Sequence, residues 1–311
     1  MKNWKALRMI AVMALIMSVS AAVAFGNGES EYDACEPAQR VMLYGSLKDS
    51  QLAAIREGFM AKYPNVVMDY YTAGTGNVMT KIATEQQAGG IAADLIWVGD
   101  PTHYEQFKAQ GLLLRYDSPV AAGVPEEFKD PDRYYISGRL IMLGFVYNTT
   151  MLSYEEAPKR WDDLLDRRYN DYLAMTDPTT SGTTLFTVAG LVQHLDYGWD
   201  FFRALKANSM RLESGSTGVV NGVAAGEYMV SVGVDYIARE IQVQGAPIAF
   251  IYPEENVPLI ASPIAIIQNT KNEAAAKLLY DYIVSELQRI RDEHGPDAMG
   301  FFGSSKTMNE E

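Results

Sequence analysis

Residues 214–240 read SGSTGVVNGVAAGEYMVSVGVDYIARE, and this stretch decides the fold that we predict for the chain. It opens with a loop rich in serine, threonine and glycine at 214–218. A short helix of small residues is expected at 219–225, and Gly226 suits its end, because glycine commonly follows a helix C-terminus. A β-rich run follows at 229–234. The order of loop, helix and strand is typical of an α/β sheet.

The β-rich run delivers Asp235, Tyr236 and Arg239 at its carboxyl end. In open α/β sheets, ligands bind at the carboxyl ends of strands, next to the starts of helices. A helix that begins in a Ser/Thr/Gly loop presents free N–H groups and the positive end of its dipole to an anion. An ordinary strand, turn and helix without a ligand would show the same pattern, so other stretches must decide.

The same order of strand, polar turn and helix recurs in the first third of the chain. Strands are expected at 41–44, 66–71 and 94–98, each followed by a turn of glycine, serine, threonine or aspartate. Helices are expected at 50–62, where apolar residues recur with helical spacing, and again up to about Gln87. This βαβ rhythm predicts a parallel sheet with right-handed crossovers.

Residues 140–147 form a long apolar run that we interpret as a crossover strand into a second domain. That domain repeats the pattern, because a strand at 173–176 leads into the hydroxyl-rich loop 177–184, where a helix begins. A last strand is expected at 263–268, and Asn272 suits the N-cap of the C-terminal helix. A mature chain of roughly 285 residues is long for one core and favours two domains.

The N-terminus has the features of a secretory signal peptide. Three basic residues precede an apolar run, which small residues and an Ala-Val-Ala triplet close. A spanning helix needs about 20 apolar residues, and this run is at the short end of that range. We therefore expect a signal peptide at 1–24, a flexible leader at 25–37 and a periplasmic location.

Charge and cysteine content exclude some functions. Removal of the signal peptide lowers the formal net charge from −13 to −16, so a nucleic-acid partner is not expected. The single cysteine, Cys35, excludes an intramolecular disulfide framework. It lies past the expected cleavage site, after Tyr32 and Asp33, so a free thiol is favoured and lipid attachment is kept as an alternative.

Six stretches of the chain stand in a recognisable order. They are LYGS at 43–46, DLIWVGD at 94–100, GFVYNT at 144–149, DPTTSG at 177–182, AAGEY at 224–228, and IASPIAII at 260–267 leading into KNEAA at 271–275. Together they resemble the bacterial extracellular solute-binding proteins of ABC importers, in the group that holds ferric-ion, phosphonate and sugar-phosphate binders. The resemblance covers nearly all of the expected mature chain and depends on order and spacing, because no single stretch is diagnostic.

The resemblance implies an α/β fold with two lobes of the periplasmic-binding-protein type II kind and a ligand cleft between them. Lobe I would comprise residues 38–139 with 256–311, and lobe II residues 140–255. It also implies a monomeric protein that is not an enzyme. Such a protein captures a small solute and passes it to a permease with its ATPase, and it needs no cofactor.

Ferric iron is one ligand that the resemblance allows. Ferric binders of this family usually present two adjacent tyrosines at the end of the strand quoted above, because Fe(III) prefers phenolate and carboxylate oxygens. Here Tyr236 matches one of the pair and Asp235 replaces the other. Coordination of Fe(III) as the transported solute by Tyr71, Asp235 and Tyr236 is therefore kept as an alternative. The three histidines are scattered and lack metal-ligand spacing.

The hydroxyl- and glycine-rich loops favour an oxyanionic solute, phosphorylated or bearing a phosphonate. Several helix starts that converge on one cleft suit an anion that takes many N–H and O–H bonds. Each loop alone is an ordinary helix cap, so the prediction depends on their recurrence. Arg139 and Arg239 either add charge or form structural ion pairs. The expected ligand-binding residues are Ser46, Gly74, Thr75, Gly76, Asn77, Thr180, Ser181, Gly182, Thr183, Ser216, Thr217, Gly218, Asp235, Tyr236 and, as a weaker candidate, Glu254.

Two other classes of function stay open from the residues alone. An exported hydrolase would need a nucleophile motif, but loop 214–218 has the wrong register for Gly-x-Ser-x-Gly. No phosphate-loop lysine motif, zinc motif or pair of catalytic carboxylates stands out in the sequence. A pure interaction protein would show no shift in melting temperature with any small molecule.

Overall fold

The computed structural model describes residues 39–193 and 197–295, all of which belong to one compact unit. The expected signal peptide and leader, with Cys35, lie outside the described residues, and so does His194. Within the described ranges, no helix is long and apolar enough to cross a membrane.

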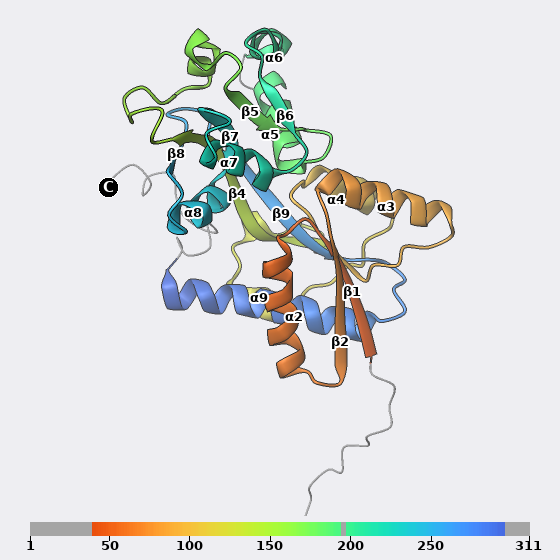
Figure 1. The fold of residues 1–311 in the computed structure, drawn as a ribbon. Helices are drawn as coiled ribbons and strands as arrows, with labels where there is room; N and C mark the ends of the chain where they lie inside the picture. Colours follow the sequence, from red (N-terminus) through yellow and green to blue (C-terminus); the bar gives the residue numbers. More distant parts are fainter. Residues whose placement is uncertain (1–38, 194–196, 296–311) are drawn as a thin grey trace, which may run out of the picture. The chain divides into compact units, whose positions relative to one another are not determined.

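In this part of the chain, nine strands form one sheet in the order β2-β1-β3-β9-β4-β7-β5-β6, and β8 pairs with β4 beside this path (Figure 1). Every predicted strand is present, although β4 and β9 begin earlier than expected, and β6 and β8 are additional. The strands are β1 (Gln39–Gly45), β2 (Val66–Thr72), β3 (Leu95–Trp97), β4 (Tyr135–Asn148), β5 (Leu173–Thr176), β6 (Arg211–Glu213), β7 (Val230–Val234), β8 (Ile248–Ile251) and β9 (Leu259–Ile266).

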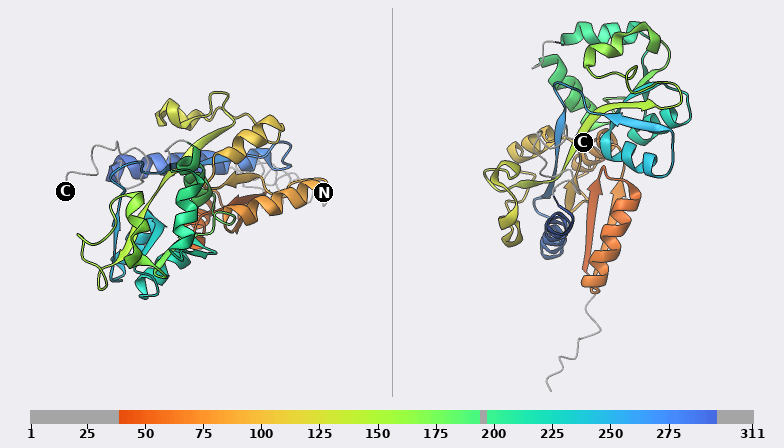
Figure 2. Two further views of the ribbon diagram at one scale, coloured as in Figure 1. Left: turned by 90° about the horizontal axis from the view of Figure 1, so that it is seen from above. Right: turned by 90° about the vertical axis from the view of Figure 1, so that its left-hand side faces the viewer.

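The expected parallel pairing is confirmed for two groups of strands. β1 pairs in parallel with β2 and β3, and β5 pairs in parallel with β6 and β7. The parallel arrangement does not extend to β4 and β9, which pair antiparallel with each other and with their other neighbours. These two strands link the parallel groups and lie side by side, running in opposite directions (Figure 2).

A bulge interrupts β4 just before Arg139. Ser137 pairs with Pro263 and Arg139 with Ser262, so Gly138 has no partner across the strand. A Cβ atom on Gly138 would lie 2.7 Å from the Trp97 ring, so only glycine fits against the indole. Bulges redirect the side chains that follow them. The Gly138 bulge therefore sets the direction of the Arg139 side chain.

Of the three buried apolar clusters among the described residues, two lie on either side of the midpoints of β4 and β9. One includes Ile136 and Ile264, together with residues of β1, β2, β3 and α9. The other includes Ile141 and Ile260, together with residues of β5, β7 and the helices beside them. We refer to these regions as the first and second cores. β4 and β9 each change core along their length, and the interpretation of 140–147 as a crossover into a second domain stays a prediction.

Eight α-helices accompany the sheet in the described ranges. The helices predicted at 50–62 and up to Gln87 are confirmed, whereas α4, α6 and α8 are additional, and α8 begins at Asp235. Asn272 occupies the N-cap of α9, but its side chain donates to the Asp94 carboxylate rather than capping the helix. The helices are α2 (Asp49–Lys62), α3 (Thr75–Gln87), α4 (Thr102–Ala109), α5 (Gly182–Gln193), α6 (Gly198–Ala207), α7 (Ser216–Ala224), α8 (Asp235–Val243) and α9 (Glu273–His294).

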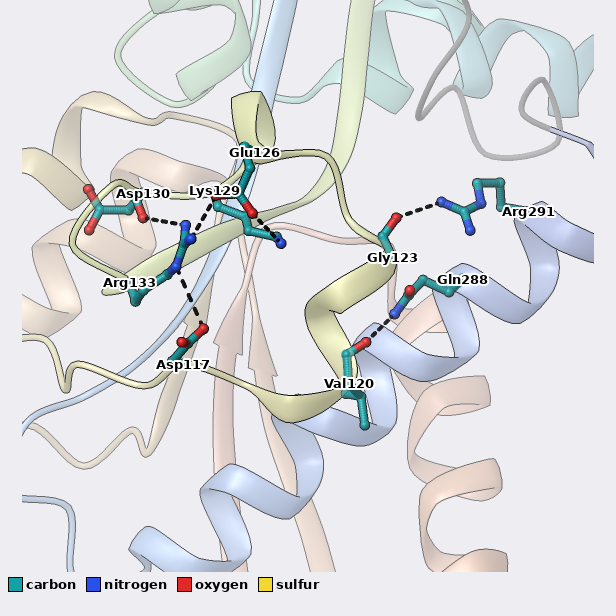
Figure 3. A network of polar contacts seen from close by, with 9 residues as sticks. All are labelled: Asp117, Val120, Gly123, Glu126, Lys129, Asp130, Arg133, Gln288 and Arg291. Atoms are coloured by element: carbon teal, nitrogen blue, oxygen red, sulfur yellow. Dashed lines mark hydrogen bonds and ion pairs between the residues drawn. The ribbon is translucent and has the colours of Figure 1, made fainter.

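The segment that leads into β4 is fastened to α9 (Figure 3). Gln288 donates to the Val120 carbonyl at 2.7 Å, and Arg291 donates to the Gly123 carbonyl at 3.1 Å. Nearer to β4, Arg133 adopts a positive φ of 66° and pairs with Glu126 at 2.7 Å. These contacts fix the chain just before β4, and so they help to hold the strand that carries Arg139.

Candidate ligand-binding site

A pocket of about 280 Å³ lies where three helix starts meet the loop that follows β1. The first residues of α3, α5 and α7 line it, and residues 46–48 form a further part of its wall. The first N–H groups of any helix have no acceptor within the helix. The pocket is therefore bordered by the positive ends of three helix dipoles.

Ten of the fifteen expected binding residues line this single pocket. They come from stretches that are far apart in the sequence, and the ends of β1, β2, β5, β6 and β7 bring them together. The hydroxyl- and glycine-bearing loops of both halves of the chain thus share one cavity. The ten are Ser46, Gly74, Thr75, Thr180, Ser181, Gly182, Thr183, Ser216, Thr217 and Tyr236.

The other five expected residues lie outside the lining. Asn77, Gly218 and Glu254 are exposed to solvent elsewhere. The Gly76 amide faces the Thr180 carbonyl at 3.4 Å instead of the cavity. Asp235 is buried at the start of α8, where its carboxylate accepts from the Tyr236 N–H at 2.7 Å.

The three residues proposed as Fe(III) ligands do not share one site in the structure. Tyr236 lines the pocket, whereas Tyr71 and Asp235 do not. The Tyr71 ring packs edge-on against Tyr44 and lies under the Lys81 ammonium, 5.4 Å from its centroid. Among the described residues, no group of three or more His, Cys, Asp or Glu side chains is arranged to hold a metal ion.

The charged side chains that line the pocket are both cationic. Lys48 comes from the loop after β1, and Arg139 comes from β4 just beyond the bulge. Among the described residues that line this cavity, there is no aspartate or glutamate. An anion would therefore meet positive charge, hydroxyl groups and amide groups, and the carboxylate near these cations, that of Glu240, lies behind the lining on Lys48.

Arg139 is held by weak contacts to neutral groups. Its guanidinium lies 3.4 Å from the Ser46 carbonyl oxygen, 3.4 Å from the Tyr236 hydroxyl and 3.3 Å from the Ser262 hydroxyl. These distances exceed the usual N–H···O range of about 2.7–3.2 Å. Within the described chain, the hydrogen-bond partners of Arg139 are neutral oxygens and not carboxylates, so its charge remains available to a ligand.

Tyr236 is the aromatic surface between the two cations. The Arg139 guanidinium carbon lies 5.6 Å from its ring centroid, and the Lys48 ammonium lies 5.9 Å from it. A cation within about 6 Å of a ring face is attracted to the ring. Lys48 also pairs with Glu240 of α8 at 2.5 Å, a contact between two segments 192 residues apart.

The hydroxyl groups of the lining differ in how far the protein already uses them. The Ser181 hydroxyl accepts from the Thr184 N–H at 3.3 Å and so caps α5. The Ser46 hydroxyl accepts from the Gly99 N–H at 3.0 Å, which leaves its own proton to donate. Ser46 is therefore placed to donate to a bound oxyanion, whereas the Ser181 hydroxyl also caps a helix.

Asp235 lies behind the lining rather than in it. Burial raises the pKa of its carboxyl group above the usual range, and the hydrogen bond from Tyr236 N–H and the charge of Arg239 oppose this shift. The Tyr252 hydroxyl contacts the other carboxylate oxygen at 3.4 Å. These contacts make Asp235 a support for the start of α8.

Several lining residues were not expected from the sequence as ligand contacts. Lys48 could have been predicted from its position, because it lies two residues after Ser46 in the loop that follows the first strand. The apolar members carry no motif and become visible only when the strands are placed in the sheet. The additional residues are Leu47, Lys48, Thr72, Ala73, Ile141, Thr176, Ser214, Gly215, Val234 and Ile237.

Comparison with known proteins identifies relatives that share this architecture. A family model described as bacterial extracellular solute-binding protein matches residues 91–293, which is more than half of the chain. A Salmonella typhimurium protein named as a candidate 2-aminoethylphosphonate-binding periplasmic protein is 25% identical over 240 residues. That match covers 74% of this chain and 68% of the relative.

Solved structures agree with this fold. The periplasmic binding protein AfuA from Actinobacillus pleuropneumoniae, solved with exogenous fructose-6-phosphate, superimposes with a TM-score of 0.74 at 25% identity, over 83% of each chain. Iron-bound HitA from Pseudomonas aeruginosa superimposes with a TM-score of 0.71 at 20% identity, over 84% of this chain and 83% of HitA, and so shares the fold. The neighbours are two-lobed binding proteins, which confirms the predicted fold class.

Members of the matching family are transport proteins that bind small solutes outside the cytoplasm and work with the permease and ATPase of an ABC importer. The chain belongs to the bacterial extracellular solute-binding proteins.

Proposed function

We propose that this protein captures a small phosphorylated or phosphonate-bearing solute in the pocket at the starts of α3, α5 and α7. The observation that carries the proposal is the composition of the lining. Among the described residues, the lining holds Lys48, Arg139 and three helix starts and no carboxylate. Such a set suits an anion with several oxygen atoms, because N–H, O–H and guanidinium donors each take one of them.

The apolar side of the pocket suits the organic part of the solute. Ile141, Val234 and Ile237 line it beside the Tyr236 ring. A cavity of about 280 Å³ matches the lower end of the range for small-molecule sites. The solute is therefore expected to be a compact ester or phosphonate rather than a large conjugate. The names of the relatives, which mention 2-aminoethylphosphonate and fructose-6-phosphate, are in keeping with this chemistry.

Iron receives less support as the ligand. A hard trivalent ion needs several anionic oxygen ligands, and Tyr236 is the one member of the ferric set that lines the pocket. Two cationic side chains beside the same ring would also repel Fe(III). An oxyanion bound by donors of the protein itself requires no resident cofactor.

A thermal-shift panel on metal-stripped protein tests the proposal. Each phosphoryl or phosphonate compound is paired with its parent lacking that group: glycerol 3-phosphate with glycerol, fructose 6-phosphate with fructose, and 2-aminoethylphosphonate with ethylamine. A ligand at 100 times its Kd stabilises the folded state by about 2.7 kcal/mol, which corresponds to roughly 5–10 °C for a protein of this size. We expect a shift of this kind with at least one charged member and none with its parent.

The opposite pattern would overturn the proposal. A shift with Fe(III) citrate alone, accompanied by visible colour, would assign the pocket to iron. Recovery of a chemically altered compound after incubation would instead revive a hydrolase. We expect the bound compound to be recovered unchanged by mass spectrometry.

A further inference from the structure

Gly76 lies where one wall of the pocket touches the other. Its amide donates to the Thr180 carbonyl at 3.4 Å, across more than 100 residues of sequence. A Cβ atom built on Gly76 would lie 2.1 Å from the Thr179 carbonyl oxygen. A Cβ atom on the neighbouring Gly74 would lie 2.5 Å from the Thr180 carbonyl oxygen. Real Cβ atoms do not approach other atoms this closely, and backbone oxygens cannot swing aside as side chains do.

Gly182 makes the reciprocal contact from the other wall. A Cβ atom on Gly182 would lie 2.8 Å from the Asp100 Cβ, 2.9 Å from the Gly99 carbonyl oxygen and 2.9 Å from the Thr75 methyl carbon. The start of α3 therefore packs on the loop before α5, and the start of α5 packs on the loop after β3. We call these contacts, made by Gly76 and Gly182, the closure seam.

The glycines at the start of α7 have no such neighbours. Gly218 is the third residue of α7, yet a Cβ atom there would meet nothing within 4 Å. Gly215, which precedes α7 and lines the pocket, also has nothing within 4 Å. The close approach at the seam is thus not a general feature of glycine-rich helix starts in this chain.

We propose that Gly76 and Gly182 are positioning residues that allow the two walls of the pocket to close on each other. Gly76 acts without touching the ligand, because it does not line the cavity. Where the inference concerns ligand affinity, it rests on the proposed function. Where it concerns the distance between the walls, it is independent of any ligand.

A methyl group at Gly76 must therefore hold the walls apart. Gly76 is the second residue of α3 and is partly exposed, so alanine is compatible with the helix itself. The cost falls on the closed arrangement and not on the fold of either wall. If only the closed arrangement binds ligand, the apparent Kd rises in proportion to the loss of the closed population.

The test compares Gly76→Ala with Gly218→Ala, a matched change in another helix start. Both are made in the full chain with Cys35→Ser, and spin labels are attached at Ala83→Cys on α3 and Asn221→Cys on α7, two exposed positions. Pulsed electron spin resonance then measures the separation of the two helices without ligand. We expect longer distances in Gly76→Ala than in the parent, and no change in Gly218→Ala. Superposition of all three distributions would overturn the inference.

Calorimetry separates this inference from the choice of ligand. With the compound that gives the largest thermal shift, Gly76→Ala should weaken binding at least about tenfold and Gly218→Ala less than twofold. If the parent binds no compound of the panel, the proposed ligand class is wrong. The distance measurement still tests whether Gly76 allows the two walls to close on each other. Gly182→Ala supplies a second variant for the distances, and far-UV circular dichroism confirms that each variant is folded.

Discussion

Replacement of Arg139 by glutamine is the sharpest perturbation of the proposed site. The change removes the charge and keeps a polar, although shorter, side chain. Two unit charges about 4 Å apart interact by about 4 kcal/mol at an effective dielectric constant of 20, and a charged hydrogen bond contributes about 1.5–3 kcal/mol net. Loss of Arg139 should therefore cost about 2–4 kcal/mol of binding, which is a rise in Kd of roughly 30- to 1000-fold.

The same change should affect stability little. The guanidinium contacts are 3.3–3.4 Å long and reach only neutral partners. We expect the free energy of unfolding to fall by about 1 kcal/mol or less, since such long contacts are weak. Urea denaturation measures this fall, and isothermal titration calorimetry with the best phosphoryl compound measures the Kd.

Arg239→Gln is the matched control. Arg239 lies on α8 beside Tyr252 and does not line the pocket. Its loss should change the Kd less than about threefold, because charges at a greater distance are screened. If Arg139→Gln binds within threefold of the unaltered protein, the assignment of Arg139 as the main anion contact is refuted.

Three further predictions concern neighbouring residues. Tyr236→Phe keeps the ring beside both cations and loses the 3.4 Å contact of the Tyr236 hydroxyl with Arg139. Calorimetry should therefore show a loss of oxyanion affinity of about threefold or less. If the unaltered protein is coloured with Fe(III) and this variant is not, iron is the ligand. Glu240→Gln frees Lys48 from its ion pair. The affinity for the anion should therefore rise roughly two- to fivefold at low salt, and this gain should disappear at high salt. An unchanged affinity at low salt would refute a role for Lys48. Burial raises the pKa of Asp235, so its protonated form stabilises the fold at low pH, and this contribution is lost as pH rises through the raised value. Asp235→Asn should remove that loss. Urea denaturation at several pH values between 4 and 8 should show that the free energy of unfolding of the variant rises relative to that of the parent as pH increases.

The sequence was sufficient to predict the shared pocket because of one geometric rule. The carboxyl ends of parallel strands lie at one edge of a sheet, so Ser46, Thr75 and Ser216 were expected to meet. They do line one pocket, although the strands belong to two parallel groups. The rule worked because it depends on strand direction and not on the exact limits of each element.

Arg139 shows what the rule could not supply. It lies inside a strand, not at a strand end, and reaches the pocket because a bulge at Gly138 redirects the chain. At the bulge, Gly138 lies close to the Trp97 ring, a contact between segments that no local pattern connects. The antiparallel course of β4 and β9 is hidden in the same way, because an apolar run does not reveal the direction of its partners.

Gly76 and Gly218 mark a second limit. Both follow a threonine at the start of a helix, and sequence reasoning placed both at the ligand. In the structure, Gly76 meets the backbone of the opposite wall, and Gly218 meets nothing. Asp235 was likewise expected in the cleft, but it is buried because α8 begins directly at the end of β7. Such differences depend on packing between distant segments.

Calorimetric titration of the EDTA-treated protein with the best phosphoryl compound tests the central claim most directly. We expect saturable binding to one site, with the same Kd in the presence and absence of EDTA, and no binding of the parent compound without its phosphoryl group. Binding that appears only after Fe(III) or a divalent cation is added would contradict that claim.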